Sequence, residues 1–213
     1  MKKISLAALA AVAAIALAAP ASAADFSFTG NLANDDQVLF FNFTVGVPSL
    51  VTLRTYSYAG GTNAAGQVIA RGGFDPILSL YDGSGVRVGQ NDDGGSPLVA
   101  IDAVSGRAWD TFFTANLVAG SYTVAVSEFD NFGPANLAGF FPGSSSVGFA
   151  DVSGVANNPR NGHWAFDVLN VGAATQVGGV VPEPATWGLM ILGMGGIGAV
   201  IRRRRNTVQA VVA

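Results

Sequence analysis

Two neighbouring stretches decide the fold class: Gln37-Val-Leu-Phe-Phe-Asn-Phe-Thr-Val45 and, after a three-residue break, Ser49-Leu-Val-Thr-Leu-Arg-Thr-Tyr56. Both are rich in β-branched and aromatic residues, which favour strands. The second also alternates, so that Val51 and Leu53 fall on one face and their neighbours on the other. A period of two residues is typical of a strand with one buried face. These two stretches therefore predict neighbouring β-strands.

Further segments of the same kind follow, separated by Gly, Asn, Asp and Pro. They span residues 25–32, 77–81, 87–91, 109–117, 121–129 and 164–171. About eight short strands with turn residues between them, and no sustained helical period, predict an all-β fold, an antiparallel β-sandwich. A long Gly-, Ser- and Asn-rich loop is expected over residues 130–161.

The charge of the middle of the chain differs from that of its ends. Six of the 11 basic residues lie at the termini, and 13 of the 14 acidic residues lie before residue 180, so the middle carries 5 − 13 = −8. Such a surface disfavours nucleic acid as a partner, because binding to phosphates needs basic patches. The absence of cysteine excludes disulfides and thiolate metal sites.

Residues 1–23 have the pattern of a cleavable signal peptide. Lys2 and Lys3 precede an apolar run that is expected to form the signal helix, and Ala21-Ser22-Ala23 supplies the small-x-small cleavage pattern, with Ala21 and Ala23 as its small residues. The sequence therefore predicts export through the general secretion machinery.

The C-terminal end has three parts. The motif Pro182-Glu183-Pro184 precedes an uncharged stretch, residues 185–201, that is long enough for a single transmembrane helix at the lower limit. A basic cluster follows, made of Arg202, Arg203, Arg204 and Arg205. Arginines on the far side of a span stay in the cytoplasm, so the preceding domain is expected to face outward.

This three-part layout resembles the PEP-CTERM sorting signal of Gram-negative bacteria, over residues 181–205. The resemblance implies a substrate of an exosortase, a membrane protease that processes such proteins, in species that make exopolysaccharide and biofilm. It implies a precursor held transiently in the inner membrane by residues 185–201 and then a cell-surface or extracellular protein. Residues 173–180 are expected to be a linker, and the tail 206–213 is longer than is usual in the family.

The middle carries a second resemblance, on Phe74-Asp75-Pro76-Ile-Leu-Ser-Leu-Tyr81-Asp82-Gly83, Asn91-Asp92-Asp93-Gly94 and Leu117-Val-Ala-Gly120-Ser-Tyr122-Thr-Val124. Together these resemble the bacterial pre-peptidase C-terminal (PPC) β-sandwich. With the ending His163-Trp164-Ala-Phe166-Asp167-Val168, they resemble more narrowly the DVUA0089 family of exported proteins. The resemblance implies a non-catalytic accessory domain over residues 24–172. Some PPC relatives bind calcium, polysaccharide or protein fibres.

Acidic residues at the predicted loops make calcium the candidate cofactor. Calcium takes six to eight oxygen ligands, and the candidate ligands are Asp35, Asp36, Asp75, Asp92 and Asp93. Because hairpin strands bring their ends together, Asp75 and Asp92 or Asp93 are expected to converge. The alternative is that these residues serve only as turn formers. Zinc is disfavoured by a chain with no Cys and a single His.

No catalytic constellation is apparent, and the chain is not expected to be an enzyme. His163 is the one histidine, and no Gly-x-Ser-x-Gly elbow accompanies it. The main hypothesis is a structural or adhesive component of the exopolysaccharide or biofilm matrix. The alternatives are a carbohydrate-binding module for exopolysaccharide and a hydrolase that uses an acidic pair. Phenylalanines in the long loop could stack on sugars, but they are expected to pack beneath the loop.

Overall fold

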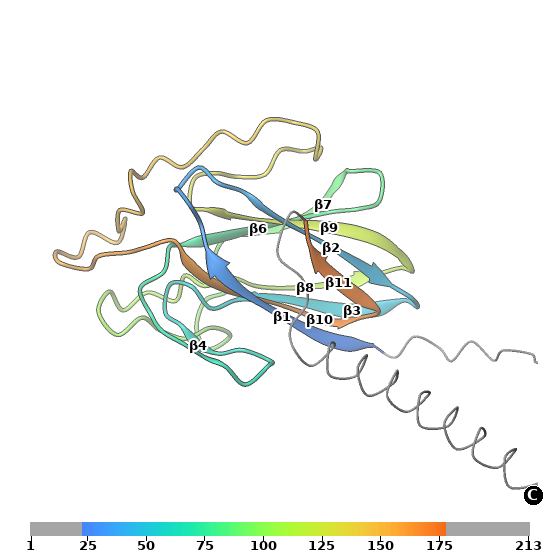
Figure 1. Cartoon of the computed structure of the whole chain (residues 1–213), viewed down its shortest axis with the longest axis horizontal. Helices are drawn as coiled ribbons and strands as arrows, with labels where there is room; N and C mark the ends of the chain where they lie inside the picture. The colour runs from blue at the N-terminus through green and yellow to red at the C-terminus, as the bar shows by residue number, and fades with distance from the viewer. Residues whose placement is uncertain (1–22, 178–213) are drawn as a thin grey trace, which may run out of the picture.

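The structure is a computed structural model that describes residues 23–177 (Figure 1). The predicted signal peptide, apart from Ala23 at its end, and the predicted sorting tail, residues 181–205, lie outside the described residues. Between residues 23 and 177 no helix has the length and apolar character needed to cross a membrane.

Two antiparallel sheets form the two layers of the molecule (Figure 1). The four-stranded sheet contains, in spatial order, β1 (Ala24–Asn31), β10 (His163–Val171), β3 (Ser49–Thr55) and β8 (Phe112–Leu117). The five-stranded sheet contains β11 (Ala173–Gln176), β2 (Leu39–Val45), β9 (Gly120–Glu128), β6 (Pro76–Tyr81) and β7 (Arg87–Asn91). A small hairpin of β4 (Gly61–Thr62) and β5 (Val68–Ile69) stands apart. Every strand pairing is antiparallel, so the all-β antiparallel sandwich is confirmed.

The core lies between the two sheets and follows from the alternation in the strands. Phe41 and Phe43 of β2 and Val51 and Leu53 of β3 are all buried, while their neighbours in sequence face outward or are partly exposed. The Phe41 ring lies 4.9 Å from the ring of Phe166 in the opposite sheet. The strands of both sheets and the buried residues of this core, as the structure describes them, lie within residues 24–177, a length and organisation typical of one domain.

The predicted strands all occur, most of them with bounds within one or two residues of those predicted, but two differences are larger. Residues 173–176, expected to begin the linker, form the edge strand β11 and pair with β2. This strand was missed because Ala-Ala-Thr-Gln is short and has weak strand preference. β8 begins at Phe112 rather than at residue 109, because the buried Asp110 side chain accepts hydrogen bonds from the backbone of Ser57 and Tyr58.

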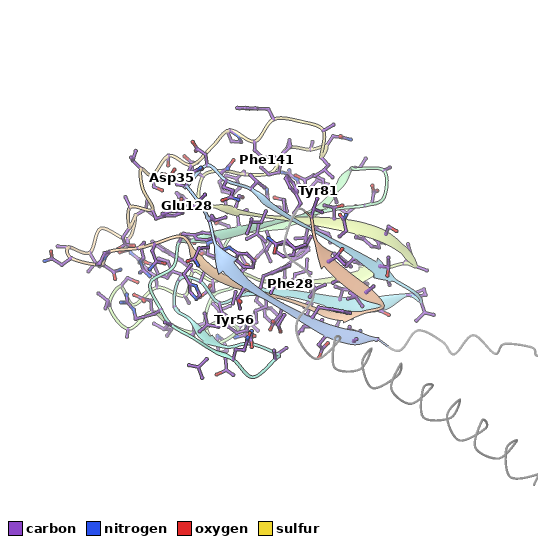
Figure 2. The ribbon with its side chains drawn as sticks, viewed as in Figure 1. Phe28, Asp35, Tyr56, Tyr81, Glu128 and Phe141 are labelled. Carbon is purple, nitrogen blue, oxygen red and sulfur yellow. The ribbon has the colours of Figure 1, made fainter. Side chains whose placement is uncertain are left out.

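The long loop after β9 covers part of the outer face of the five-stranded sheet (Figures 1 and 2). Phe141 of the loop packs edge-on against Phe40 of β2, with 5.8 Å between ring centroids. Phe149 packs against the core. Phe140, by contrast, is 83% exposed. The loop aromatics therefore mostly pack beneath the loop, as expected.

Candidate metal site

The β6–β7 hairpin brings three predicted ligands together. Its register pairs Leu78 with Asn91, so the start of β6 lies beside the end of β7. Asp75 directly precedes β6, and Asp92 and Asp93 directly follow β7. One oxygen from each of these three carboxylates lies within 4.8 Å of the other two. The expected convergence of Asp75 with Asp92 or Asp93 is thus observed.

The site runs from the interior to the surface. Asp75 is 7% exposed, Asp92 is half-buried and Asp93 is exposed. Three oxygens here are buried and have no hydrogen-bond partner: Asp75 Oδ1, Asn91 Oδ1 and Asp92 Oδ1. A buried acceptor without a donor costs about 1 to 3 kcal/mol, and more where it carries charge. An oxygen cluster of this kind is therefore incomplete without a cation or donors from outside the chain.

Arg160 and Arg107 act on Asp75 and Asp93 only from a distance, each partly offsetting the rise in pKa that burial causes. Among the described residues, none of the ion pairs involves Asp75, Asp92 or Asp93. Burial, followed by repulsion from Asp92 and Asp93, raises the pKa of Asp75 to about 9. Burial and the charge of Asp93 raise the pKa of Asp92 to about 6. Both shifts express the cost of holding negative charges together away from water.

A glycine fixes the loop that carries Asp92 and Asp93. The Gly94 N–H donates to the carbonyl of Asp110 at 2.9 Å. A Cβ at Gly94 would lie 2.8 Å from the backbone nitrogen of Phe112, so only glycine fits this close approach. The loop is therefore held against the four-stranded sheet at the point where it presents the two carboxylates.

On its inner side, Asp75 adjoins a small cavity of about 10 Å³, also lined by Tyr58, Glu128 and Arg160. That volume suits a single water molecule. The cavity is too small for an organic substrate.

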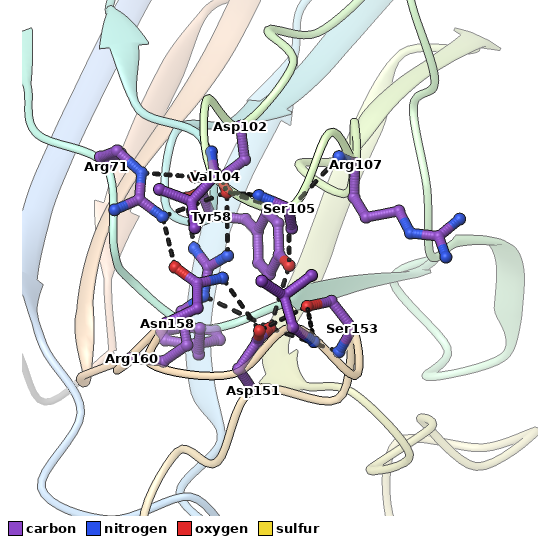
Figure 3. A network of polar contacts seen from close by, with 12 residues as sticks. Tyr58, Arg71, Asp102, Val104, Ser105, Arg107, Asp151, Ser153, Asn158 and Arg160 are labelled. Atoms are coloured by element: carbon purple, nitrogen blue, oxygen red, sulfur yellow. Dashed lines mark hydrogen bonds and ion pairs between the residues drawn. The ribbon is translucent and has the colours of Figure 1, made fainter.

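Beyond this cavity, a buried polar network joins three loops (Figure 3). Arg160 donates to the Tyr58 carbonyl at 2.8 Å and to Asp102 at 3.2 Å, and its guanidinium carbon lies 3.4 Å from the centre of the Tyr58 ring. Arg71 donates twice to Asp102, at 2.6 and 3.1 Å. Asp151 lies 3.5 Å from Arg160. In this network each charge has a partner, in contrast to the three carboxylates at the hairpin.

Because of these partners, the charges in the network are stabilised. Burial alone would raise the pKa of Asp102, but the hydrogen bonds from Arg71 and Ser105 hold it below its ordinary value. Sequence reasoning missed this network, because its members are far apart along the chain and no local motif joins them.

Asp35 and Asp36, also predicted as calcium ligands, lie elsewhere. The carboxylate of Asp36 accepts a hydrogen bond from the Ser144 N–H at 2.9 Å, and that of Asp35 accepts one from the Gly148 N–H at 2.5 Å. Both therefore hold the long loop. Glu128 lies at the same end of the molecule as Asp35 (Figure 2), and its pKa is raised to about 7 by burial and by the nearby Asp35 and Asp36.

The donor set at the hairpin suits a hard cation. It offers three carboxylates, which are groups that calcium prefers, and no nitrogen or sulfur ligand. Asn91, the last residue of β7, adjoins this set along the chain, and its amide oxygen is also buried and unpartnered. Asn91 was quoted in a sequence motif but was not among the predicted ligands.

Comparison with known proteins bears on the C-terminal end. Residues 180–205 match the PEP-CTERM protein-sorting motif. The chain carries this sorting signal. The PEP-CTERM match coincides with the predicted motif, span and arginine cluster at residues 181–205. PEP-CTERM signals imply an exported, membrane-anchored precursor and an exosortase as the partner that processes it.

The chain was also compared with curated proteins and with solved structures. No curated protein matches it. Among solved structures, it is similar to the pre-peptidase C-terminal domain of a collagenase from Bacillus anthracis, with 11% sequence identity and a TM-score of 0.34. That match covers 71% of this chain and 90% of the collagenase domain. The sandwich architecture rests on the strand pairings described above.

Proposed function

We propose that this exported, exosortase-processed protein presents a calcium-stabilised, non-catalytic β-sandwich at the cell surface, as a structural or adhesive component of the exopolysaccharide or biofilm matrix. The observation that supports calcium is the set of buried, unpartnered oxygens on Asp75, Asn91 and Asp92. The clustering of Asp75, Asp92 and Asp93 gives a hard-oxygen site of high negative charge.

The physical argument concerns charge. The metal-free fold holds three carboxylates together with no ion pair to another described residue. Burial, and then repulsion between these groups, raises the pKa of Asp75 and of Asp92. A bound divalent cation would offset this repulsion and satisfy the unpartnered oxygens. Calcium sites of extracellular modules bind at about 10⁻⁴ to 10⁻³ M. Such a domain would reach its full stability only after export, where calcium is plentiful.

The non-catalytic assignment rests on the shortage of catalytic groups. His163, the one histidine in the sequence, lies at the first position of β10, and its carbonyl accepts a hydrogen bond from Ser57. The cavity beside Asp75 has room for one water only, which disfavours a hydrolase acting on a sugar through the Asp75–Asp92 pair. A stabilising role for the metal fits this geometry better.

The test is a thermal melt of residues 24–177 with calcium, with magnesium and with chelator. Calcium at about 100 times its Kd stabilises a native state by about 2.7 kcal/mol, which raises the Tm of a domain of this size by about 5 to 10 °C. Asp92→Asn should abolish the shift. A wild-type Tm that is the same in calcium and in chelator would refute the calcium site.

A further inference from the structure

A groove of about 360 Å³ crosses the outer face of the five-stranded sheet. Its floor comes from β11, β2 and β9, and its end is the β6–β7 turn at Asp82 and Gly83. Asp82 follows β6, whereas Asp75 precedes it, so the groove and the metal site lie at opposite ends of one strand.

The floor is a row of polar side chains that are direct neighbours across three strands. Thr175 of β11 pairs with Asn42 of β2, and Asn42 pairs with Thr123 of β9. A second row pairs Thr44 with Ser121. Neighbouring strands lie about 4.8 Å apart, so the groove presents hydroxyl and amide groups at a regular spacing close to the length of one sugar ring.

These groups remain able to bind. Thr123 donates its hydroxyl to Asn42 Oδ1 at 2.9 Å, which leaves the Asn42 NH₂ group free to donate outward. Thr44 and Thr175 are exposed, and a hydroxyl both donates and accepts. At the end of the groove, Asp82 uses Oδ1 to accept from Ser84 and Val86, which leaves its second oxygen for an outside donor.

One wall of the groove, which contains Leu137, is held in place without a ligand. The Leu137 N–H donates to the Gly85 carbonyl at 2.8 Å. The adjacent Asn136 forms a bridge with Val86, and the Arg87 N–H donates to Ala135 at 3.0 Å. The long loop is therefore bonded to the hairpin, so the groove is largely preformed, as small-molecule sites usually are.

We propose that this groove binds a neutral oligosaccharide. Its volume lies in the range of about 300 to 1,000 Å³ usual for ligand sites. Asp82 is the one charged residue that lines it, and residues 23–177 carry 5 − 13 = −8, so an anionic glycan meets repulsion and no basic partner. A ligand with many hydroxyl groups matches the hydroxyl and amide rows. A peptide strand does not, because the groove lies on a sheet face, where the backbone groups are already paired.

This inference goes beyond the calcium-stabilised module and does not depend on it, since no residue is shared between the two sites. The experiment is a titration of ¹⁵N-labelled residues 24–177 with cellotetraose, mannotetraose and isomaltotetraose, followed by amide NMR shifts. Tetragalacturonate is the anionic comparison. Each titration is run in calcium and in chelator. The titrations report sugar binding in the groove, and the thermal melts report the metal site, so the failure of one proposal is distinguished from the failure of the other.

The deciding variant is Thr44→Val/Thr123→Val/Thr175→Val. It removes three hydroxyls at nearly constant shape and keeps β-branched residues in the strands, so the fold should survive. The matched control is Thr52→Val/Thr114→Val, a cross-strand pair on the other sheet. We expect a neutral tetrasaccharide to shift the amides of residues 42–44, 121–123 and 173–175. The triple variant should weaken this binding at least about tenfold, because several hydrogen bonds are lost, and the control should not.

Three results would overturn the proposal. The first is the absence of shifts with every neutral tetrasaccharide at several millimolar. The second is a set of shifts that maps away from the groove or that persists unchanged in the triple variant. The third is binding of tetragalacturonate in the groove as tightly as the neutral sugars.

Discussion

A carboxylate oxygen of Asp75 lies within 4.8 Å of one of Asp92, and each residue has a buried Oδ1 with no hydrogen-bond partner. The two residues stand at the adjoining ends of β6 and β7, so the hairpin itself forces them together. Whatever neutralises this pair therefore controls the stability of the domain.

Asp75→Asn should have opposite effects with and without calcium. Without metal, the wild type at pH 8 folds with Asp75 mostly protonated, because its pKa is raised to about 9, whereas the unfolded chain is ionised. Asn needs no proton on folding, so the variant should melt higher than the wild type at pH 8, by roughly 3 to 8 °C for about 1 to 3 kcal/mol. Adding calcium should leave the Tm of this variant almost unchanged. Asp82→Asn, at the other end of β6, is the control and should keep the wild-type calcium shift. A variant that melts like the wild type in both conditions would contradict this assignment.

The metal-free domain should lose stability as the pH rises. The pKa of Asp75 is raised to about 9 and that of Asp92 to about 6, above the ordinary value of about 3.9 expected in the unfolded chain. The unfolded chain therefore ionises first, and stability that is complete below pH 4 declines up to about pH 6 for Asp92 and about pH 9 for Asp75. Calcium favours the ionised groups, so its effect on Tm should grow from pH 5 to pH 8. Melts across this range measure how Tm changes with pH in calcium and in chelator. A calcium effect that shrinks with pH would be inconsistent with carboxylate ligands.

Asp35 and Asp36 should be dispensable for the calcium effect. Their carboxylates accept hydrogen bonds from the loop at Gly148 and Ser144, and they lie apart from the three clustered carboxylates. Asp35→Asn/Asp36→Asn should lower Tm slightly by weakening the loop contacts but should retain the calcium shift that Asp92→Asn loses. Loss of the shift in the double variant would place a second cation site beside Glu128.

Glu128→Gln should stabilise the metal-free domain at pH 8 and have little effect at pH 5. Glu128 Oε2 is buried without a partner, while Oε1 accepts from the Ser146 hydroxyl at 2.7 Å. Its pKa is raised to about 7, so the wild type loses stability between about pH 4.5 and pH 7 as the unfolded chain ionises. Gln keeps the Ser146 contact and cannot ionise. A difference of a few degrees at pH 8 that vanishes at pH 5 is the expected result. Equal differences at the two pH values would assign the effect to packing.

Arg160→Met should be far more damaging than Arg71→Met. The Arg160 side chain is 2% exposed and contacts both Asp102 and Asp151, so its removal leaves buried charge uncompensated, at a cost of about 3 to 5 kcal/mol. The Arg71 side chain is 35% exposed, and Asp102 keeps Arg160 when Arg71 is lost, so about 1 kcal/mol is expected. Urea unfolding of the two variants gives the comparison. Equal losses would mean that the network has no dominant member.

Much of the fold could be predicted because strand alternation is local. The alternating pattern in Ser49–Tyr56 predicted strand β3, and Val51 and Leu53 are buried in it. β11 could not be predicted in this way, because its four residues have weak strand preference and gain a partner only when β2 is already in the sheet. The β4–β5 hairpin was missed because two residues in each strand are too few to show an alternating pattern.

The candidate site, too, could be predicted only in part from the sequence. The sequence by itself determined that the domain is all-β, negatively charged and without cysteine, and that a sorting motif follows it, because composition, alternation and short motifs are properties of neighbouring residues. It also indicated the meeting of Asp75 with Asp92 or Asp93, since the outer ends of two adjoining hairpin strands of similar length lie close together. Only the tertiary structure decided that Asp35 and Asp36 hold the long loop, that Arg160 neutralises Asp102, and that Thr175, Asn42 and Thr123 form one row. Those relationships join residues far apart in the chain, and they depend on strand order and on the path of a loop, which no local pattern records.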